Sequence, residues 1–134
     1  YSNDASFGHN NTKAALQGSN DWASWEAEAR REGATKMGAY QVVLHYVFQL
    51  MHEGLEICAV GGSGAAAQAK WDQAFAYFAG SLEGADGSGS GKSFYALSDK
   101  RCPQFLTCQA NTGLAMVNVN IVQAFTDGVA ALGA

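Results

Sequence analysis

Hydrophobic and polar residues alternate along most of the chain with the period of an α-helix. Between about residue 34 and residue 59 an apolar line recurs every three or four positions, which predicts the longest helix with a buried stripe. This line consists of Tyr40, Val43, Leu44, Val47, Met51, Leu55 and Cys58. A polar line spans roughly 80° of the same predicted helix at about 100° per residue. It consists of Gln41, His45, Gln49, His52 and Glu56.

An aromatic helix is predicted from Ala65 onward. Its core face consists of Trp71, Phe75, Phe78 and Leu82. Asp72 and Glu83 lie three helical turns apart and therefore share another face. The Gly-rich residues 84–91 end this helix, and Ser93 begins another that leads to the Cys102/Cys108 pair.

The helical periodicity of apolar residues is weak at the N-terminal end of the chain and clear at the C-terminal end. Residues 1–20 show no clear periodicity and predict an irregular N-terminal arm with one turn around Thr12–Leu16. A short helix is expected over residues 22 to about 31, after N-cap candidates at 19–21. The last helix is predicted from Leu114, Val117, Ile121, Phe125, Val129 and Leu132. Because no stretch alternates with period two, we expect an all-α bundle of about four main helices in one domain, residues 21–134.

Trp22 and Trp25 lie three residues apart and therefore on one side of the short predicted helix. The usual role of such a pair is core packing. The alternative is an exposed aromatic pair that docks on a partner protein.

Composition and charge exclude several classes of function. With 48% hydrophobic and 15% charged residues the chain is globular. A net charge of −4 without a basic stripe argues against nucleic-acid binding. No apolar run reaches the roughly 20 residues of a transmembrane helix. Residues 87–92 lack the order of a phosphate-binding loop, and no nucleophile elbow is present, so we expect no enzyme.

Three cysteines leave one without a partner inside the chain. Cys102 and Cys108 are predicted to form a disulfide, because they are close in sequence after a helix and Pro103 turns the chain. This pairing indicates an oxidising, extracytoplasmic compartment: a periplasm, the exterior or an organelle lumen. Cys58 is then a buried thiol or the true partner of one of the other two.

The first residues carry two further indications. Asn10, with Asn11 and Thr12, forms an N-glycosylation sequon. The sequence begins at Tyr1 without Met, and we expect a mature or excised domain whose targeting segment has been removed.

Two segments resemble the algal iron-assimilating, high-carbon-dioxide-inducible periplasmic proteins. They are WDQAFAYFAGSLEG, which begins at Trp71, and ALSDKRCPQFLTC, which ends at Cys108. Upstream, Leu50-Met51-His52-Glu53 with Glu56 and Cys58 is similar to a further helix of that family. Gln73 stands where the family tends to have a carboxylate. The resemblance implies a secreted helical domain linked to iron uptake, without enzyme activity.

Helical spacing and the resemblance together predict an iron site between helices. Imidazole and carboxylate ligands suit iron. The expected ligands are His52, Glu56, Asp72 and Glu83, with His45 and Glu53 in reserve. A di-iron centre of the Glu-x-x-His type is not expected, because the paired motif is missing.

Two functions follow as expectations. The first is an extracytoplasmic domain that binds or presents iron without catalysis. The alternative is a non-catalytic extrinsic subunit that docks on a larger, membrane-associated protein assembly. An exposed aromatic patch favours docking, and a convergent group of histidines and carboxylates favours iron.

Overall fold

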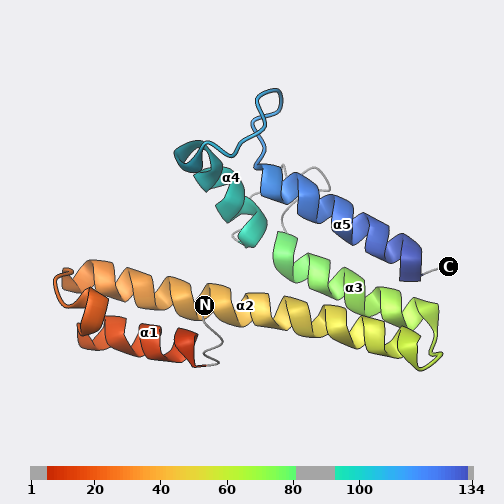
Figure 1. The fold of residues 1–134 in the computed structure, drawn as a ribbon, viewed down its shortest axis with the longest axis horizontal. Helices are drawn as coiled ribbons and strands as arrows, with labels where there is room; N and C mark the ends of the chain where they lie inside the picture. Colours follow the sequence, from red (N-terminus) through yellow and green to blue (C-terminus); the bar gives the residue numbers. More distant parts are fainter. Residues whose placement is uncertain (1–5, 81–92, 133–134) are drawn as a thin grey trace. The chain divides into compact units, whose positions relative to one another are not determined.

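The computed structural model describes residues 6–80 and 93–132, and these residues form α-helices (Figure 1). The helices are α1 (Phe7–Gln17), α2 (Ala27–Ala59), α3 (Gly64–Ala79), α4 (Phe94–Phe105) and α5 (Met116–Leu132), with a 3-10 turn, η1 (Asn20–Trp22). The predicted all-α fold is confirmed. The described chain divides into a first unit within Tyr1–Leu44 and a second unit within His45–Ala134.

Helix α1 corrects the expectation of an irregular arm over residues 1–20. Its buried residues are Ala14 and Ala15, and Gly18 ends the helix in the left-handed conformation with φ of 64°. The Ser19 N–H donates to the Ala14 carbonyl at 3.0 Å and closes the last turn. Because the buried side chains are alanines, the helix carries no strong apolar periodicity that the sequence could reveal.

The boundary between two predicted helices near residue 31 is also wrong. Helix α2 starts at Ala27 and continues through Gly33, and residues 20–22 form η1 instead. The Trp22 ring occupies the space beside Gly33, where a Cβ would overlap it. The Trp22 Nε1–H donates to Asn11 Oδ1 at 2.8 Å. This glycine therefore marks a close helix contact and not a break.

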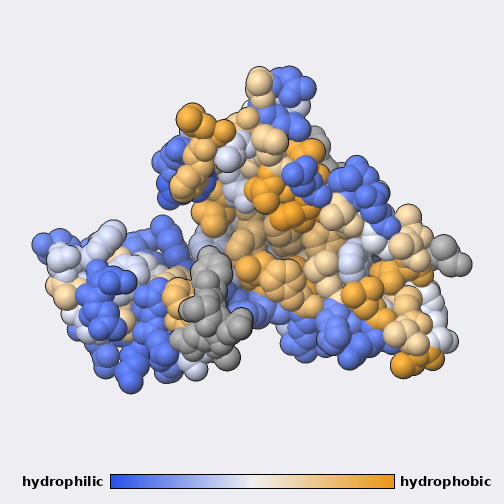
Figure 2. Space-filling model, viewed as in Figure 1, coloured by the Kyte–Doolittle hydropathy of each residue, from blue (hydrophilic) through white to orange (hydrophobic). Residues whose placement is uncertain are grey.

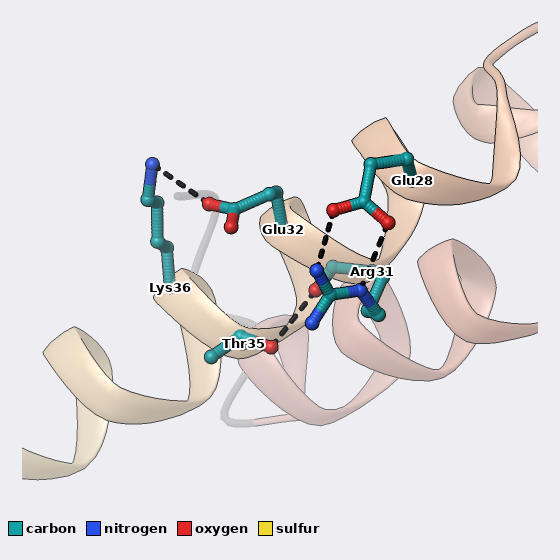
Figure 3. A network of polar contacts seen from close by, with 5 residues as sticks. All are labelled: Glu28, Arg31, Glu32, Thr35 and Lys36. Carbon is teal, nitrogen blue, oxygen red and sulfur yellow. Dashed lines mark hydrogen bonds and ion pairs between the residues drawn. The ribbon is translucent and has the colours of Figure 1, made fainter.

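Polar pairs line the start of α2 (Figure 3). Arg31 forms an ion pair with Glu28, and the Lys36 ammonium lies 3.0 Å from Glu32. The hydrogen bond from Arg31 holds the pKa of Glu28 below its ordinary value, and the charge of Arg31 adds to this effect. Thr35 Oγ1 donates to the Arg31 carbonyl. Since all these side chains are exposed, they stabilise the helix only locally and weakly.

Aromatic side chains form the core of the second unit, as the spacing predicted for α3. Trp71 and Phe78 are buried, and the Trp71 and Phe75 rings lie 5.7 Å and 5.2 Å from the Phe125 ring of α5. Tyr95 of α4 packs edge-on against Phe78. The three helices α3, α4 and α5 therefore share one core.

The ends of α3 and α4 agree only in part with the expected boundaries. Helix α3 ends at Ala79, and Gly80 follows with φ of 91°. Leu82 and residues 84–91 lie outside the described residues. Ser93 precedes α4 in an extended conformation, and its hydroxyl donates to the Tyr77 carbonyl, which confirms the predicted start of that helix.

The predicted disulfide between Cys102 and Cys108 is confirmed, with 5.0 Å between the two Cα atoms. It closes the connection between α4 and α5, where Cys108 forms an isolated antiparallel bridge with Ala115. This bridge delays the start of α5 to Met116, two residues after the predicted start. Cys58 is a free cysteine and is exposed, so the expectation of a buried thiol or a third disulfide partner is wrong.

Candidate functional site

The two expected metal ligands on α2 lie next to one another. His52 Nε2 is 3.2 Å from Glu56 Oε1, the separation expected for residues four apart on a helix. Both side chains are more than 60% exposed. The reserve ligand His45, which lies two helical turns before His52, is also exposed.

Glu53 is engaged by a cation from α3. Its carboxylate lies 2.7 Å from the Lys70 ammonium and accepts a hydrogen bond from the Gln49 amide at 2.9 Å. The hydrogen bond from Lys70, followed by that from Gln49, lowers the pKa of Glu53. Because Lys70 occupies this carboxylate, Glu53 serves as a link between α2 and α3 in this structure.

Asp72 lies away from the α2 ligands. It lines a small pocket of about 110 Å³ between α3 and α5, together with apolar side chains of both helices. Glu53 and Glu56 line a different, open depression of about 490 Å³ with Lys70. Helix α3 thus presents Asp72 on the side of α5 and Lys70 on the side of α2.

Across residues 6–80 and 93–132, no three His, Cys, Asp or Glu side chains converge on a point where they could hold a metal ion. The structure brings His52 and Glu56 together and leaves Asp72 apart from them. Glu83, the fourth expected ligand, lies outside the described residues. Iron binding therefore stays a prediction, with two adjacent side chains in place.

A line of apolar side chains on α2 is partly exposed within the second unit. We call it the docking stripe: Phe48, Met51, Leu55 and Cys58, spaced by three, four and three residues. Met51 is half-buried and the other three are exposed. Leu55 and Cys58 belong to the line predicted to be buried, so that prediction is wrong at these two positions. Phe48 is 58% exposed and Leu55 is 52% exposed. Val47, Leu50 and Gly54 of α2 are buried, and Val47 lies only about 20° from Cys58 and about 40° from Met51 around the helix axis. The docking stripe therefore borders the buried side of the helix and extends its apolar surface into solvent.

Of the tryptophan pair that the alternative prediction places at the surface, one ring is exposed in the first unit and the other is half-buried. Trp22 is half-buried, and Trp25 is 55% exposed, with 5.5 Å between the ring centroids. One ring therefore packs in the unit while the other faces solvent. Asn10 is exposed on α1, and its glycosylation stays a prediction.

Sequence reasoning missed a buried polar cluster where α4 meets α5. Asn118 is fully buried, and its Nδ2 donates to Asp99 Oδ1 at 2.9 Å and to the Tyr95 carbonyl at 2.9 Å. Asp99 Oδ1 also accepts the Ala115 N–H at 2.7 Å. An asparagine within an otherwise apolar helical pattern was the available signal, because a buried amide requires partners. The cluster fixes the start of α5 on α4.

Apolar residues at the same junction were also missed. Phe105 is 72% exposed and Leu106 is 92% exposed at the end of α4, and Met116 at the start of α5 is 51% exposed. Their signal was the Phe-Leu pair inside the disulfide-closed segment. Figure 2 shows hydrophobic surface over the end of α4, with hydrophilic surface beside it.

Helices among the described residues are all too short or too polar to cross a membrane. Comparison of the chain with protein-family models, with curated proteins and with solved structures gives no match.

Proposed function

We propose that this protein is a non-catalytic interaction subunit that docks on a helix of a larger extracytoplasmic, membrane-associated assembly. The observation that supports the proposal is the docking stripe on α2. Single exposed apolar residues are common on protein surfaces, but a helical line of them is typical of an interface. The confirmed disulfide is compatible with an extracytoplasmic location.

The spacing of the stripe favours a helical partner. Residues separated by three and four positions form a narrow seam, the pattern by which one helix packs its side chains between those of another. Phe48 is the largest exposed side chain of this seam, and Leu55, seven residues later, is the next exposed one. Both groups would lose contact with water in such a complex, which stabilises association.

A photo-crosslinking residue in place of Phe48 tests the proposal in the native membrane fraction. Adducts are expected at this position, and peptide mapping should identify one recurrent helix of one partner. The matched control carries the same residue at Gln73, which is exposed on α3 outside the stripe. Equal labelling from both positions would refute a specific docking stripe, and adducts only between copies of this chain would assign the seam to self-association.

Iron presentation is a second candidate, supported by the adjacent side chains of His52 and Glu56 and by the family resemblance. Two exposed ligands bind a metal weakly unless a third joins them. The substitution His52→Ala should abolish bound iron in protein purified from its source, measured by elemental analysis. His9→Ala, which removes an exposed histidine of α1 outside the ligand set, serves as the control, and an unchanged iron content in the His52 variant would exclude this candidate.

A further inference from the structure

Phe105 and Leu106 form the apolar tip of α4, where the disulfide-closed connection to α5 begins. We call this connection the disulfide loop, residues 102–115, and it projects away from the helices in Figure 1. Its turn, residues 109–113, is mostly polar. Leu106 follows α4 with φ of 56°, a conformation that leucine rarely adopts. Its side chain is 92% exposed, and the neighbouring Phe105 is 72% exposed. The fold thus holds two large apolar side chains in water.

Several backbone N–H groups in and beside this loop donate to carbonyls of the loop. The Thr107 N–H donates to the Cys102 carbonyl at 3.0 Å, and the Gln109 N–H donates to the Leu114 carbonyl at 2.8 Å. The Met116 N–H donates to the Thr107 carbonyl at 2.9 Å. Each of these hydrogen bonds lowers the cost of moving the loop's backbone out of water toward a lipid phase.

The charges near the tip have one sign. From residue 100 to residue 126 the sequence contains two charged residues, Lys100 and Arg101, and both are cationic. The nearest carboxylate, Asp99, is turned inward to the Ala115 N–H and Asn118. Arg101 lies one helical turn before Phe105 and therefore on the same side of α4. Cations beside an apolar tip complement the headgroups of an anionic bilayer, although the whole chain is acidic.

We propose that the apolar tip of α4 inserts shallowly into the surface of an anionic lipid bilayer. Phe105 and Leu106 enter the boundary between headgroups and acyl chains, and Lys100 and Arg101 contact the headgroups. An exposed apolar pair beside cations fits a deformable anionic surface better than the flat face of a second protein. This surface differs from the docking stripe, so the two proposals are tested separately.

Binding of the full chain to vesicles tests the inference. The probe is a vesicle of phosphatidylcholine and phosphatidylserine in equal amounts, compared with phosphatidylcholine alone, and the readout is sedimentation with the vesicles. We expect the double substitution Phe105→Ser and Leu106→Asn to lower the partition coefficient on the mixed vesicles by at least about tenfold. Asparagine at position 106 keeps the left-handed conformation.

Two controls sharpen the result. Val60→Ser removes an apolar side chain that is 84% exposed elsewhere in the second unit, and it should leave vesicle binding unchanged. Lys100→Gln should weaken binding to the mixed vesicles and not to phosphatidylcholine, because it removes only the attraction to anionic headgroups. Circular dichroism should show unchanged helix content in all variants, since the substituted side chains are exposed.

The inference is overturned if the parent protein binds neither kind of vesicle, or if the double variant binds as well as the parent. Crosslinks from position 105 to a protein, with no vesicle binding, would assign the tip to a protein cavity and equally refute it. Crosslinking from Phe48 should not change in the double variant. A loss of crosslinking there would contradict the docking stripe as a surface separate from the tip.

Discussion

Both units place a tryptophan ring against a helix glycine, but they surround it differently. In the first unit Trp22 lies beside Gly33, is half-buried and donates to the side chain of Asn11. In the second unit Trp71 lies beside Gly128, is buried and donates to a backbone carbonyl of α5. Alanines and a polar side chain surround the first ring, whereas aromatic side chains surround the second. We therefore expect the contact in the second unit to stabilise its unit more than the contact in the first unit does.

The largest expected effect tests the core of the second unit. Trp71→Ala should lower the free energy of unfolding by about 3–5 kcal/mol, because it removes a buried ring and its hydrogen bond and leaves a cavity. Urea unfolding followed by circular dichroism measures the change. Trp25→Ala, which removes an exposed ring, is the control and should change stability by less than about 0.5 kcal/mol. Equal losses in both variants would contradict the comparison.

The disulfide is expected to contribute the next largest share, again in the second unit. Replacing Cys102 and Cys108 together by serine should cost about 2–3 kcal/mol, since the bond removes chain entropy from the unfolded state. Urea unfolding of the variant and of the reduced parent protein should give similar midpoints. Cys58→Ser is the matched control, because this thiol is free and exposed. A midpoint unchanged by reduction would show that packing alone holds the loop.

A smaller effect is expected at the tryptophan of the first unit. Trp22→Phe keeps most of the ring against Gly33 and removes the hydrogen bond to Asn11, which should cost about 1 kcal/mol. Hydrogen exchange at α1 amides measures the local stability. Amides of α5 should keep their protection and serve as the internal control. Loss of protection in α5 as well would mean that the two units unfold together.

The smallest expected effect is a pH dependence carried by Glu53. Its pKa is lowered in the folded protein, so its ion pair with Lys70 stabilises the fold above the ordinary glutamate value and loses this contribution as the pH falls through the lowered pKa. Glu53→Gln should therefore reduce the loss of stability on acidification. Glu28→Gln should have a weaker effect, because its pair with Arg31 lies within one exposed turn of α2. The test is the change in Tm between pH 6 and pH 3 for the parent protein and the two variants. Identical changes in all three would refute the contribution of Glu53 to the pH dependence.

The sequence predicted best where large side chains repeat at helical spacing. The aromatic positions Trp71 and Phe78 gave the core face of α3 directly, because a periodic line of large apolar residues has few alternatives to burial. Helix α1 escaped prediction because alanine contributes little to an apolar pattern. The predicted break between residues 31 and 34 is absent, and the Trp22 ring that packs beside Gly33 depends on tertiary contact that the local sequence does not show.

The candidate site was less predictable than the fold. Helical spacing placed His52 beside Glu56, which depends only on local geometry. It could not place Asp72, because the rotation of α3 about its axis is set by packing of the aromatic core and not by its polar residues. Asn118 was missed for a similar reason: its role depends on Asp99, which lies on another helix.

The distribution of tryptophan also gives each unit its own optical signal. The chain contains three tryptophans: Trp22 and Trp25 in the first unit and Trp71 in the second. Trp71 is only 8% exposed and should emit at short wavelength, whereas Trp25, which is 55% exposed, should emit at long wavelength and be quenched readily by iodide. Intrinsic fluorescence can therefore follow the melting of the two units separately, without any added dye.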